Sequence, residues 1–196
     1  MTEAEWLAAE HPTPLFRLIE DTASERKCVL FAVACHHLPA AYDPDGYEAR
    51  KARAAELSHA VDFVDGRLSV AEIRKLLSRQ GAAQHLPERG REWASGWACP
   101  PVWDFEDPLE VDVAALLREV FGNPFRPVAV EPAWLTSTVV ALAEGIYQDR
   151  AFDRLPILAD ALQDAGCDNE DVLNHCRSDG PHVRGCWVVD LLTGRT

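Results

Sequence analysis

Helix boundaries recur along this chain and constrain its fold more than any other feature. Capping boxes, in which a Thr or Ser and the Glu three residues later satisfy each other's backbone N–H groups, open helices at Thr2 and Ser69. Apolar residues then repeat at the three- and four-residue intervals of one helix face. Glycines, which favour the left-handed turn that ends a helix, follow several of these stripes, at Gly122, Gly166 and Gly194. The sequence therefore predicts an all-α protein, an irregular multi-helix bundle.

Further helix starts are expected from capping residues and from proline, which is tolerated at the first helical position. Thr13 followed by Pro14 predicts the start of a second helix. Asp153 is expected to cap another, and Asp168 or Asn169 a short helix that follows it.

Two apolar segments leave room for one short buried strand. In residues 28–35, CVLFAVAC, the side chains of Cys28, Phe31 and Cys35 share one helical face, but the run is also apolar enough for a strand. Residues 182–194, HVRGCWVVDLLTG, fit either a helix ended by glycine or a buried strand. We favour a helix in the second case.

The helical signals stop at residues 80–107, a segment rich in Pro, Gly and Trp. We expect a single helical domain over residues 1–196. In it, this irregular connector joins an N-terminal helical part, 1–79, to a C-terminal helical part, 108–196.

Three of the six tryptophans lie in that connector, and they are candidates for a partner-binding surface. Trp is enriched at the energetic centres of protein interfaces, which favours such a role for Trp93, Trp97 and Trp103. The alternative is that each of them covers an edge of the core.

The charge of the chain excludes some partners. Its 32 Asp and Glu against 19 Lys and Arg give a net charge of −13, whereas binding to phosphate backbones requires Lys and Arg. We therefore expect no nucleic acid and no membrane, and a basic protein partner fits better. The N-terminal residues are acidic and do not have the pattern of a secretory signal. The longest apolar run is too short to span a bilayer. A soluble cytoplasmic protein is expected, whose six cysteines are reduced thiols or metal ligands.

One stretch, CDNEDVLNHCRSDGPHVRGC at residues 167–186, has the composition of a zinc site. Its candidate ligands are separated by eight, five and three residues, and they are Cys167, Cys176, His182 and Cys186, with His175 as an alternative ligand. These gaps match those of CCCH-type zinc fingers with the last Cys and His exchanged. Those fingers bind RNA through basic residues, whereas this stretch is acidic. The alternative is a packed helical hairpin in which the thiols are small buried hydrophobes.

A second Cys/His cluster lies near the N-terminus, at Cys28, Cys35, His36 and His37. It could meet the first cluster in space, but core packing explains these residues more simply.

Both ends of the chain carry a family resemblance, through MTEAEWL at 1–7, FGNPFRPVAVEPAWLT at 121–136 and GPHVRGCWVVDLLTG at 180–194. In these stretches the chain resembles a large group of uncharacterised bacterial proteins with many paralogues per genome. The resemblance implies a shared fold and no known catalytic residue. Members often have Leu at the position of Cys176, which argues against that thiol as an essential ligand.

The sequence contains no recognisable catalytic motif. The chain has no Gly-rich phosphate loop, no HExxH and no GxSxG. One charged residue stands out, because Arg184 lies among apolar neighbours and should have a carboxylate partner. Asp160, Asp164 and Asp190 are the candidates.

Three functions follow from the sequence, in order of preference. The first is a non-enzymatic protein-interaction module, for which an immunity or antitoxin role against a basic toxin is one form. The second is a structural zinc-binding protein. The sequence favours no cofactor, and zinc is the alternative. The third is a thiol-dependent enzyme, with Cys186 or Cys35 as nucleophile and His182 or His36 as base.

Overall fold

The computed structural model describes residues 1–36, 59, 61–69, 72 and 109–195. Every regular element in these residues is a helix, and they contain no strand. The predicted all-α class is therefore confirmed. The alternative of a short buried strand is wrong for both apolar segments, because residues 28–35 lie within one helix and 187–193 form another.

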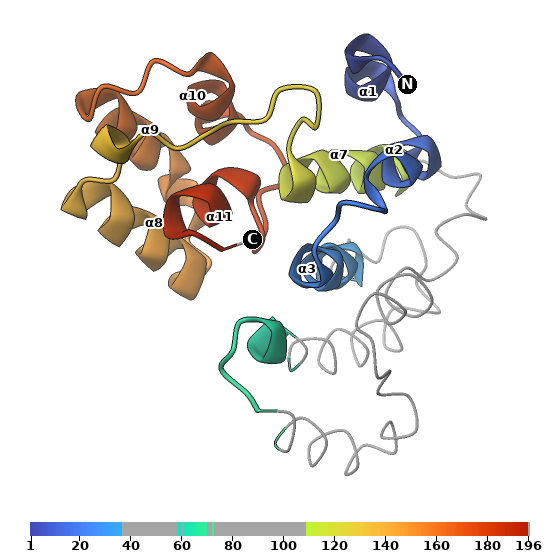
Figure 1. The fold of residues 1–196 in the computed structure, drawn as a ribbon, viewed down its shortest axis with the longest axis horizontal. Helices are drawn as coiled ribbons and strands as arrows, with labels where there is room; N and C mark the ends of the chain where they lie inside the picture. The colour runs from blue at the N-terminus through green and yellow to red at the C-terminus, as the bar shows by residue number, and fades with distance from the viewer. Residues whose placement is uncertain (37–58, 60, 70–71, 73–108, 196) are drawn as a thin grey trace.

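Three N-terminal helices lie on one side of the molecule (Figure 1), namely α1 (Glu3–Ala8), α2 (Pro12–Ile19) and α3 (Glu25–His36). Helices α2 and α3 both pack against α7 (Leu109–Phe121). The core between them is apolar and includes Trp6, Leu15, Phe31 and Leu117, none of them more than 2% exposed. This N-terminal group therefore depends on a helix that follows it by more than 70 residues along the chain.

The C-terminal helices form a second group on the other side (Figure 1), with bounds α8 (Ser137–Asp149), α9 (Leu155–Asp164), α10 (Glu170–Arg177) and α11 (Trp187–Thr193). Two short 3-10 helices, η5 (Pro132–Trp134) and η6 (Phe152–Arg154), precede α8 and α9. Helix α9 packs on α8 and α10, and α11 packs on α8. Their shared core includes the thiols of Cys167, Cys176 and Cys186.

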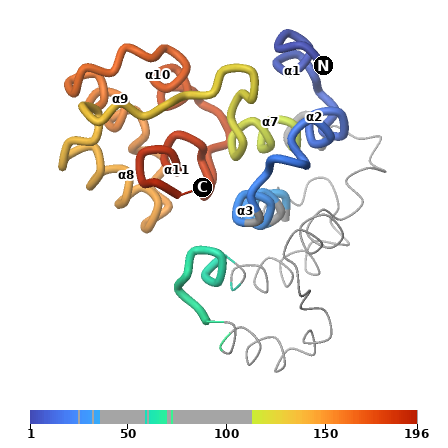
Figure 2. The backbone as a smooth tube through the Cα atoms, viewed as in Figure 1, coloured from blue at the N-terminus to red at the C-terminus, as the bar shows by residue number. Residues whose placement is uncertain are grey.

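Helix α7 stands between the two groups, and a segment from 122 to 131 leads from its end to the C-terminal helices (Figure 2). Gly122 ends α7 with a φ of +70°, as its position in the sequence predicts. A Cβ at this glycine would lie 3.2 Å from Cγ of Trp187. The end of α7 therefore lies directly against the first residue of α11.

Most predicted helix boundaries agree with the structure, and two do not. The capping boxes at Thr2 and Ser69 are both present. Helix α2 begins at Pro12 rather than Pro14, because the ring Nδ1 of His11 accepts the backbone N–H of Thr13 and caps the helix earlier. Asp153 caps nothing, since it lies inside η6, which runs directly into α9 without a side-chain cap.

A buried ion network joins the two helical groups. Arg26 on α3 donates to both carboxylate oxygens of Asp190 on α11, at 2.6 and 3.1 Å, and to Oδ1 of Asp65, at 2.9 Å. It also donates to the hydroxyl of Tyr147 on α8, at 2.8 Å, and that hydroxyl donates to Asp65. Because Arg26, Asp190 and Tyr147 are each at least 92% buried, this network fixes α3 against α8 and α11.

The predicted connector, residues 80–107, lies outside the described residues, so the division of the chain around it stays a prediction. The same is true of Trp93, Trp97 and Trp103 as a partner-binding surface. Among the helices that are described, none is long and apolar enough to cross a membrane.

Candidate metal centre

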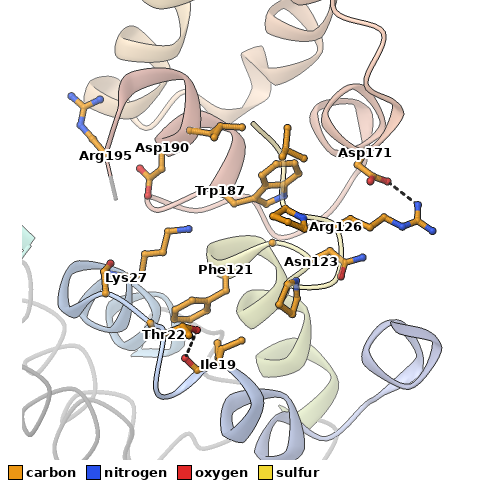
Figure 3. A pocket seen from close by; sticks show the side chains of 17 residues that line it. Ile19, Thr22, Lys27, Phe121, Asn123, Arg126, Asp171, Trp187, Asp190 and Arg195 are labelled. Carbon is orange, nitrogen blue, oxygen red and sulfur yellow. Dashed lines mark hydrogen bonds and ion pairs between the residues drawn. The ribbon is translucent and has the colours of Figure 1, made fainter. Parts of the chain in front are cut away.

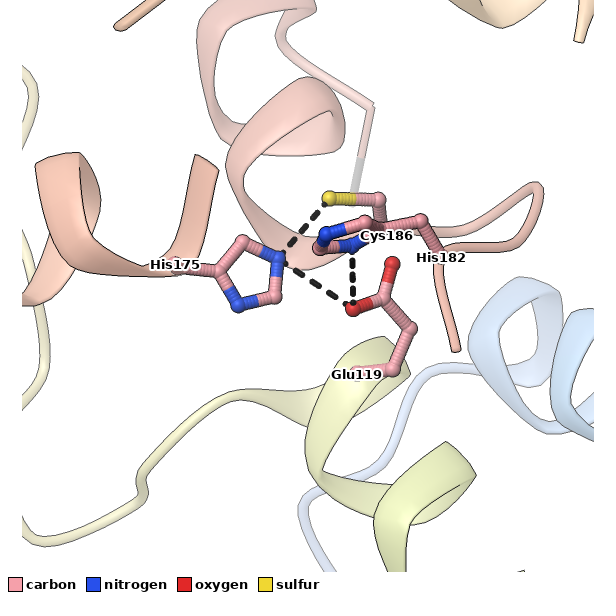
Figure 4. Close-up of side chains that lie close together, drawn as sticks. All are labelled: Glu119, His175, His182 and Cys186. Atoms are coloured by element: carbon pink, nitrogen blue, oxygen red, sulfur yellow. Dashed lines mark hydrogen bonds and ion pairs between the residues drawn. The ribbon is translucent and has the colours of Figure 1, made fainter. Parts of the chain in front are cut away.

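Four side chains that can bind metal converge where α7 meets the C-terminal helices (Figure 4). Glu119 comes from the last turn of α7, His175 from the last turn of α10, and His182 and Cys186 from the segment that leads into α11. One ligand atom of each lies within 4.8 Å of those of the other three. Glu119 and Cys186 are buried, and the two histidine side chains are 10–15% exposed.

Local hydrogen bonds and packing fix the turn that carries these residues. Asn169 caps α10 by accepting the N–H of Val172, which orients a helix whose apolar residues face the core. The hydroxyl of Ser178 donates to the carbonyl of His175 and closes the end of α10. Gly185, with a φ of +101°, then brings the backbone against Leu30 of α3. The side chain of Cys186, the next residue, is thereby held inside the core.

The carboxylate of Glu119 is the centre of the group. Its Oε2 lies 3.1 Å from Nδ1 of His182 and 3.2 Å from Nε2 of His175, and its Oε1 accepts the N–H of Val183 at 3.3 Å. Burial by itself would raise the pKa of this carboxyl. The hydrogen bonds from the two histidines and the positive charge of His182 outweigh that effect, so the pKa lies below its usual value and Glu119 is ionised.

His182 lies between two acceptors. Its Nε2 faces the backbone carbonyl of Ser178 at 3.0 Å, and its Nδ1 faces the carboxylate of Glu119. A neutral imidazole has only one N–H, so both contacts are satisfied only when the ring is protonated. Burial lowers the pKa of His182, but the hydrogen bond to Glu119 and its charge raise it more, and the net pKa is above its usual value.

His175 has the opposite arrangement. Its Nδ1 accepts the indole N–H of Trp187 at 3.1 Å, which assigns the ring proton to Nε2. That Nε2–H points at Oε2 of Glu119 and at Sγ of Cys186, 3.1 Å away. As placed, His175 is therefore a donor into the group, and it becomes a ligand only when its proton moves to Nδ1.

Two thiols near the group are held in the protonated form. Cys186 is fully buried, and burial, followed by the charge of Glu119, raises its pKa well above the usual value. The same two causes raise the pKa of Cys176 to about 12. Neither thiol is an ionised nucleophile near neutral pH in the absence of a metal or another cation.

The structure brings together only part of the ligand set expected from the sequence. His182, Cys186 and the alternative ligand His175 lie in the group. Cys167 and Cys176 do not, since both are buried among apolar side chains of the C-terminal core. In the N-terminal cluster Cys28 is buried and Cys35 packs against the core, while the side chain of His36 and all of His37 lie outside the described residues.

Sequence reasoning missed Glu119. Its position in the sequence could have indicated it, because Glu119 lies three residues after Leu116 and one before Val120. Both of these neighbours are buried. A carboxylate beside a buried stripe needs partners. Its partners, His175 and His182, are 56 residues or more away along the chain, so no local sequence pattern predicts them.

None of the three predicted carboxylate partners pairs with Arg184, so the candidates Asp160, Asp164 and Asp190 are wrong. Asp190, one of the candidates, pairs instead with Arg26. The guanidinium of Arg184 lies over the ring of Tyr147, with 4.6 Å from its carbon to the ring centroid. Its Nε is buried without a hydrogen-bond partner.

A larger cavity of about 390 Å³ lies between α3, α7 and α11, and Trp187 is one of the residues that line it (Figure 3). Apolar residues such as Ile19, Phe121 and Trp187 form much of its wall. Lys27 also lines it and donates to the carbonyl of Val120 at 2.9 Å, which satisfies the last turn of α7. Trp187 is therefore a wall of this cavity and a hydrogen-bond donor to the candidate metal centre.

Comparison with known proteins adds no further constraint. No protein-family model, no curated protein and no solved structure matches this chain. The case for the site therefore rests on its own geometry, in which a Glu, two His and a Cys could hold a metal ion.

Proposed function

We propose that this chain binds one divalent ion of the zinc class through Glu119, His182, Cys186 and His175. The observation that carries the proposal is the convergence of their ligand atoms, all within 4.8 Å of one another in a mostly buried place. Zinc bond lengths of roughly 2.0–2.3 Å would set the ligand atoms of a tetrahedral site about 3.3–3.8 Å apart. The contacts of 3.1 and 3.2 Å from Oε2 of Glu119 to the two histidine nitrogens are close to that spacing.

The donor chemistry supports zinc over the hard cations. A thiolate and two imidazoles suit zinc and its neighbours, whereas Mg²⁺ and Ca²⁺ take oxygen ligands almost exclusively. His182 is already oriented as metal-binding histidines usually are, with one ring nitrogen facing the group and the other donating to the backbone carbonyl of Ser178.

The role that this arrangement supports is structural. Four protein ligands leave no open position for a substrate. The ion would join the last turn of α7 to α10 and to the start of α11, so its binding free energy would stabilise the contact between the two helical groups. Without metal, the imidazolium of His182 and the carboxylate of Glu119 make a weaker version of the same contact.

The other predicted roles have less support. A protein-interaction role is compatible with a structural metal, and the net charge of −13 favours a basic partner. Its candidate tryptophans lie outside the described residues. A thiol-dependent enzyme that uses Cys186 is disfavoured, because that thiol is fully buried and its pKa is raised.

The test compares zinc content and zinc affinity in four proteins: the unmodified chain, Cys186→Ala, Glu119→Gln and Cys176→Ala. Elemental analysis gives the content, and competition with a chromophoric chelator gives the affinity. We expect about one zinc per chain in the unmodified protein, and a loss of affinity of about 100-fold or more in Cys186→Ala, because it removes a direct ligand.

Cys176→Ala is the matched control, because both thiols are fully buried in the same core and only one belongs to the group. It should keep its zinc. Glu119→Gln removes charge at almost constant volume, so a weaker affinity there cannot come from a cavity. The proposal fails if the unmodified protein binds no zinc, or if Cys186→Ala binds it as tightly as Cys176→Ala does.

A further inference from the structure

A second, smaller cavity of about 150 Å³ is lined in part by His182. Its apolar wall comes mainly from α3 and from Phe152, and its remaining wall from the turn after α8 and from the segment before α11. The lining residues are Leu30, Val33, Ala34, Val61, Arg150, Phe152, His182, Val183 and Arg184.

The charge of this lining is one-sided. Among the described residues it contains two arginines and a histidine and no carboxylate, in a chain whose acidic residues exceed its Lys and Arg by 13. Neither Arg150 nor Arg184 makes an ion pair with any described residue. Asp65, whose charge acts on Arg184, is already bound by Arg26 and Tyr147. In the part of the chain that the structure describes, the positive charge of this cavity therefore has no carboxylate paired with it.

Arg184 supplies the clearest sign of a missing partner. The Nε of its guanidinium is buried and makes no hydrogen bond. An unsatisfied buried donor on a charged group is costly, because it loses its hydrogen bonds to water and gains none in the protein. The face of the guanidinium is taken by the ring of Tyr147, which leaves its edge for an acceptor. Carboxylates are the acceptors that match such an edge in two parallel hydrogen bonds.

Arg150 gives an independent indication. It ends α8 with a φ of +55°, the left-handed conformation, and it is the one non-glycine residue with a positive φ in the described part of the chain. Glycine would adopt this conformation at lower cost. The backbone alone therefore does not require an arginine here, and Arg150 is one of the residues that line the cavity.

The larger cavity beside Trp187 lacks these features. Its Arg126 pairs with Glu3 and Asp171, its Arg195 pairs with Glu144, and its Asp190 pairs with Arg26. Since these charged groups are paired within the protein, and Lys27 donates to the carbonyl of Val120, this cavity offers less reason to bind a charged ligand.

We propose that the smaller cavity is a binding site for a short-chain monocarboxylate. The carboxylate lies against Arg184 and Arg150, and the apolar chain lies against Leu30, Val33 and Phe152. A volume of about 150 Å³ is below the ~300–1,000 Å³ of sites for drug-sized ligands, so the ligand is small. The apolar wall favours an organic anion over inorganic phosphate. This inference does not rest on the proposed metal.

The experiment titrates the full-length protein with isovalerate by calorimetry at low ionic strength, with side-chain methyl NMR as a second readout. Two comparison ligands separate charge from shape: 3-methylbutanamide, which has the same chain without the charge, and inorganic phosphate, which has charge without the chain. We expect saturable binding of isovalerate, with the amide and the phosphate each at least about tenfold weaker.

Variants locate the site. Arg150→Gly should weaken isovalerate binding about tenfold or more while leaving the fold intact, because glycine suits the backbone there. Arg184→Gln should weaken it similarly. Arg154→Gln, which changes an exposed arginine outside the lining, is the matched control and should bind as the unmodified protein does. Absence of saturable isovalerate binding, equal binding of the amide, tighter binding of phosphate, or indifference to both arginine substitutions would each overturn the proposal.

Discussion

At the residue scale, the candidate metal centre depends on where protons reside. The metal-free group holds one proton on the thiol of Cys186 and two on the ring of His182, and the pKa values of both groups are raised. A metal ion must displace the thiol proton and the Nδ1 proton of His182. Metal binding and proton release are therefore coupled.

This coupling predicts the pH dependence of zinc affinity. Raised pKa values mean that both protons are bound at mildly acidic pH, so the affinity must increase as the pH rises. Two protons leave per zinc below the pKa of His182, which gives a slope of about two in log affinity per pH unit, and about one above it. Chelator competition from about pH 5.5 to 8.5, corrected for protonation of the chelator, measures the slope. A slope near zero would instead indicate binding to exposed carboxylates.

The hydrogen bond between Trp187 and His175 predicts a second effect. The indole N–H holds the ring proton of His175 on Nε2, which opposes its use as a ligand. Trp187→Phe removes that N–H and keeps an aromatic ring against Gly122, so zinc should bind about fivefold more tightly, the equivalent of about 1 kcal/mol.

Trp134→Phe is the control for this change. Trp134 is buried in the same core, and its indole N–H has no hydrogen-bond partner. Its replacement should leave zinc affinity unchanged. An affinity that is unchanged or weaker in Trp187→Phe would mean that His175 does not become a ligand.

At the scale of the elements, the sequence predicted what is local and missed what is not. Capping residues and terminal glycines act within a few positions of the helix end they define, so the starts at Thr2 and Ser69 and the end of α7 at Gly122 were predictable. Of the group in the candidate metal centre, His182, Cys186 and, as an alternative, His175 lie within one short stretch and were named. Glu119 reaches them only through the packing of α7 on α11, which no pattern in the sequence specifies.

The turn before α11 predicts a measurable difference between two glycines. Gly185 has a positive φ, and a Cβ there would lie 3.0 Å from Cβ of Leu30, whereas Gly166 has a positive φ with nothing within 4 Å. Gly166→Ala should cost only the left-handed strain, about 1–2 kcal/mol of unfolding free energy. Gly185→Ala should cost about 1–3 kcal/mol more, because α3 must move away.

Denaturant unfolding of the two variants measures this difference, and the strain common to both cancels in the comparison. A displaced α3 should also loosen the wall of the smaller cavity that Leu30 forms. Equal losses in both variants would show that the turn can relax without disturbing α3.

At the scale of the whole molecule, polar groups join the two helical groups at more than one place, and two of these places are largely buried. One is the candidate metal centre, and the other is the buried network around Arg26. A single guanidinium there serves Asp190, Asp65 and Tyr147, from three different parts of the chain. Such a network stabilises the fold only while it is complete. A buried charge that loses its partner keeps the free-energy cost of its removal from water and therefore destabilises the folded state.

The network therefore predicts strong non-additivity. Arg26→Met leaves Asp190 buried without its partner and should lower the free energy of unfolding by about 3–5 kcal/mol. Adding Asp190→Leu removes that orphaned charge, while Asp65 still pairs with Arg67 at 2.6 Å. The double variant should thus be more stable than Arg26→Met alone, by at least about 1 kcal/mol.

An exposed ion pair provides the comparison. Arg177 pairs with Asp160, whose side chain is 74% exposed, so Arg177→Met should cost less than about 1 kcal/mol. Denaturant unfolding of the four proteins measures all these differences under one condition. If Arg26→Met costs no more than Arg177→Met, the network does not hold the two groups together. If the double variant is less stable than Arg26→Met, the carboxylate of Asp190 stabilises the fold through contacts other than Arg26.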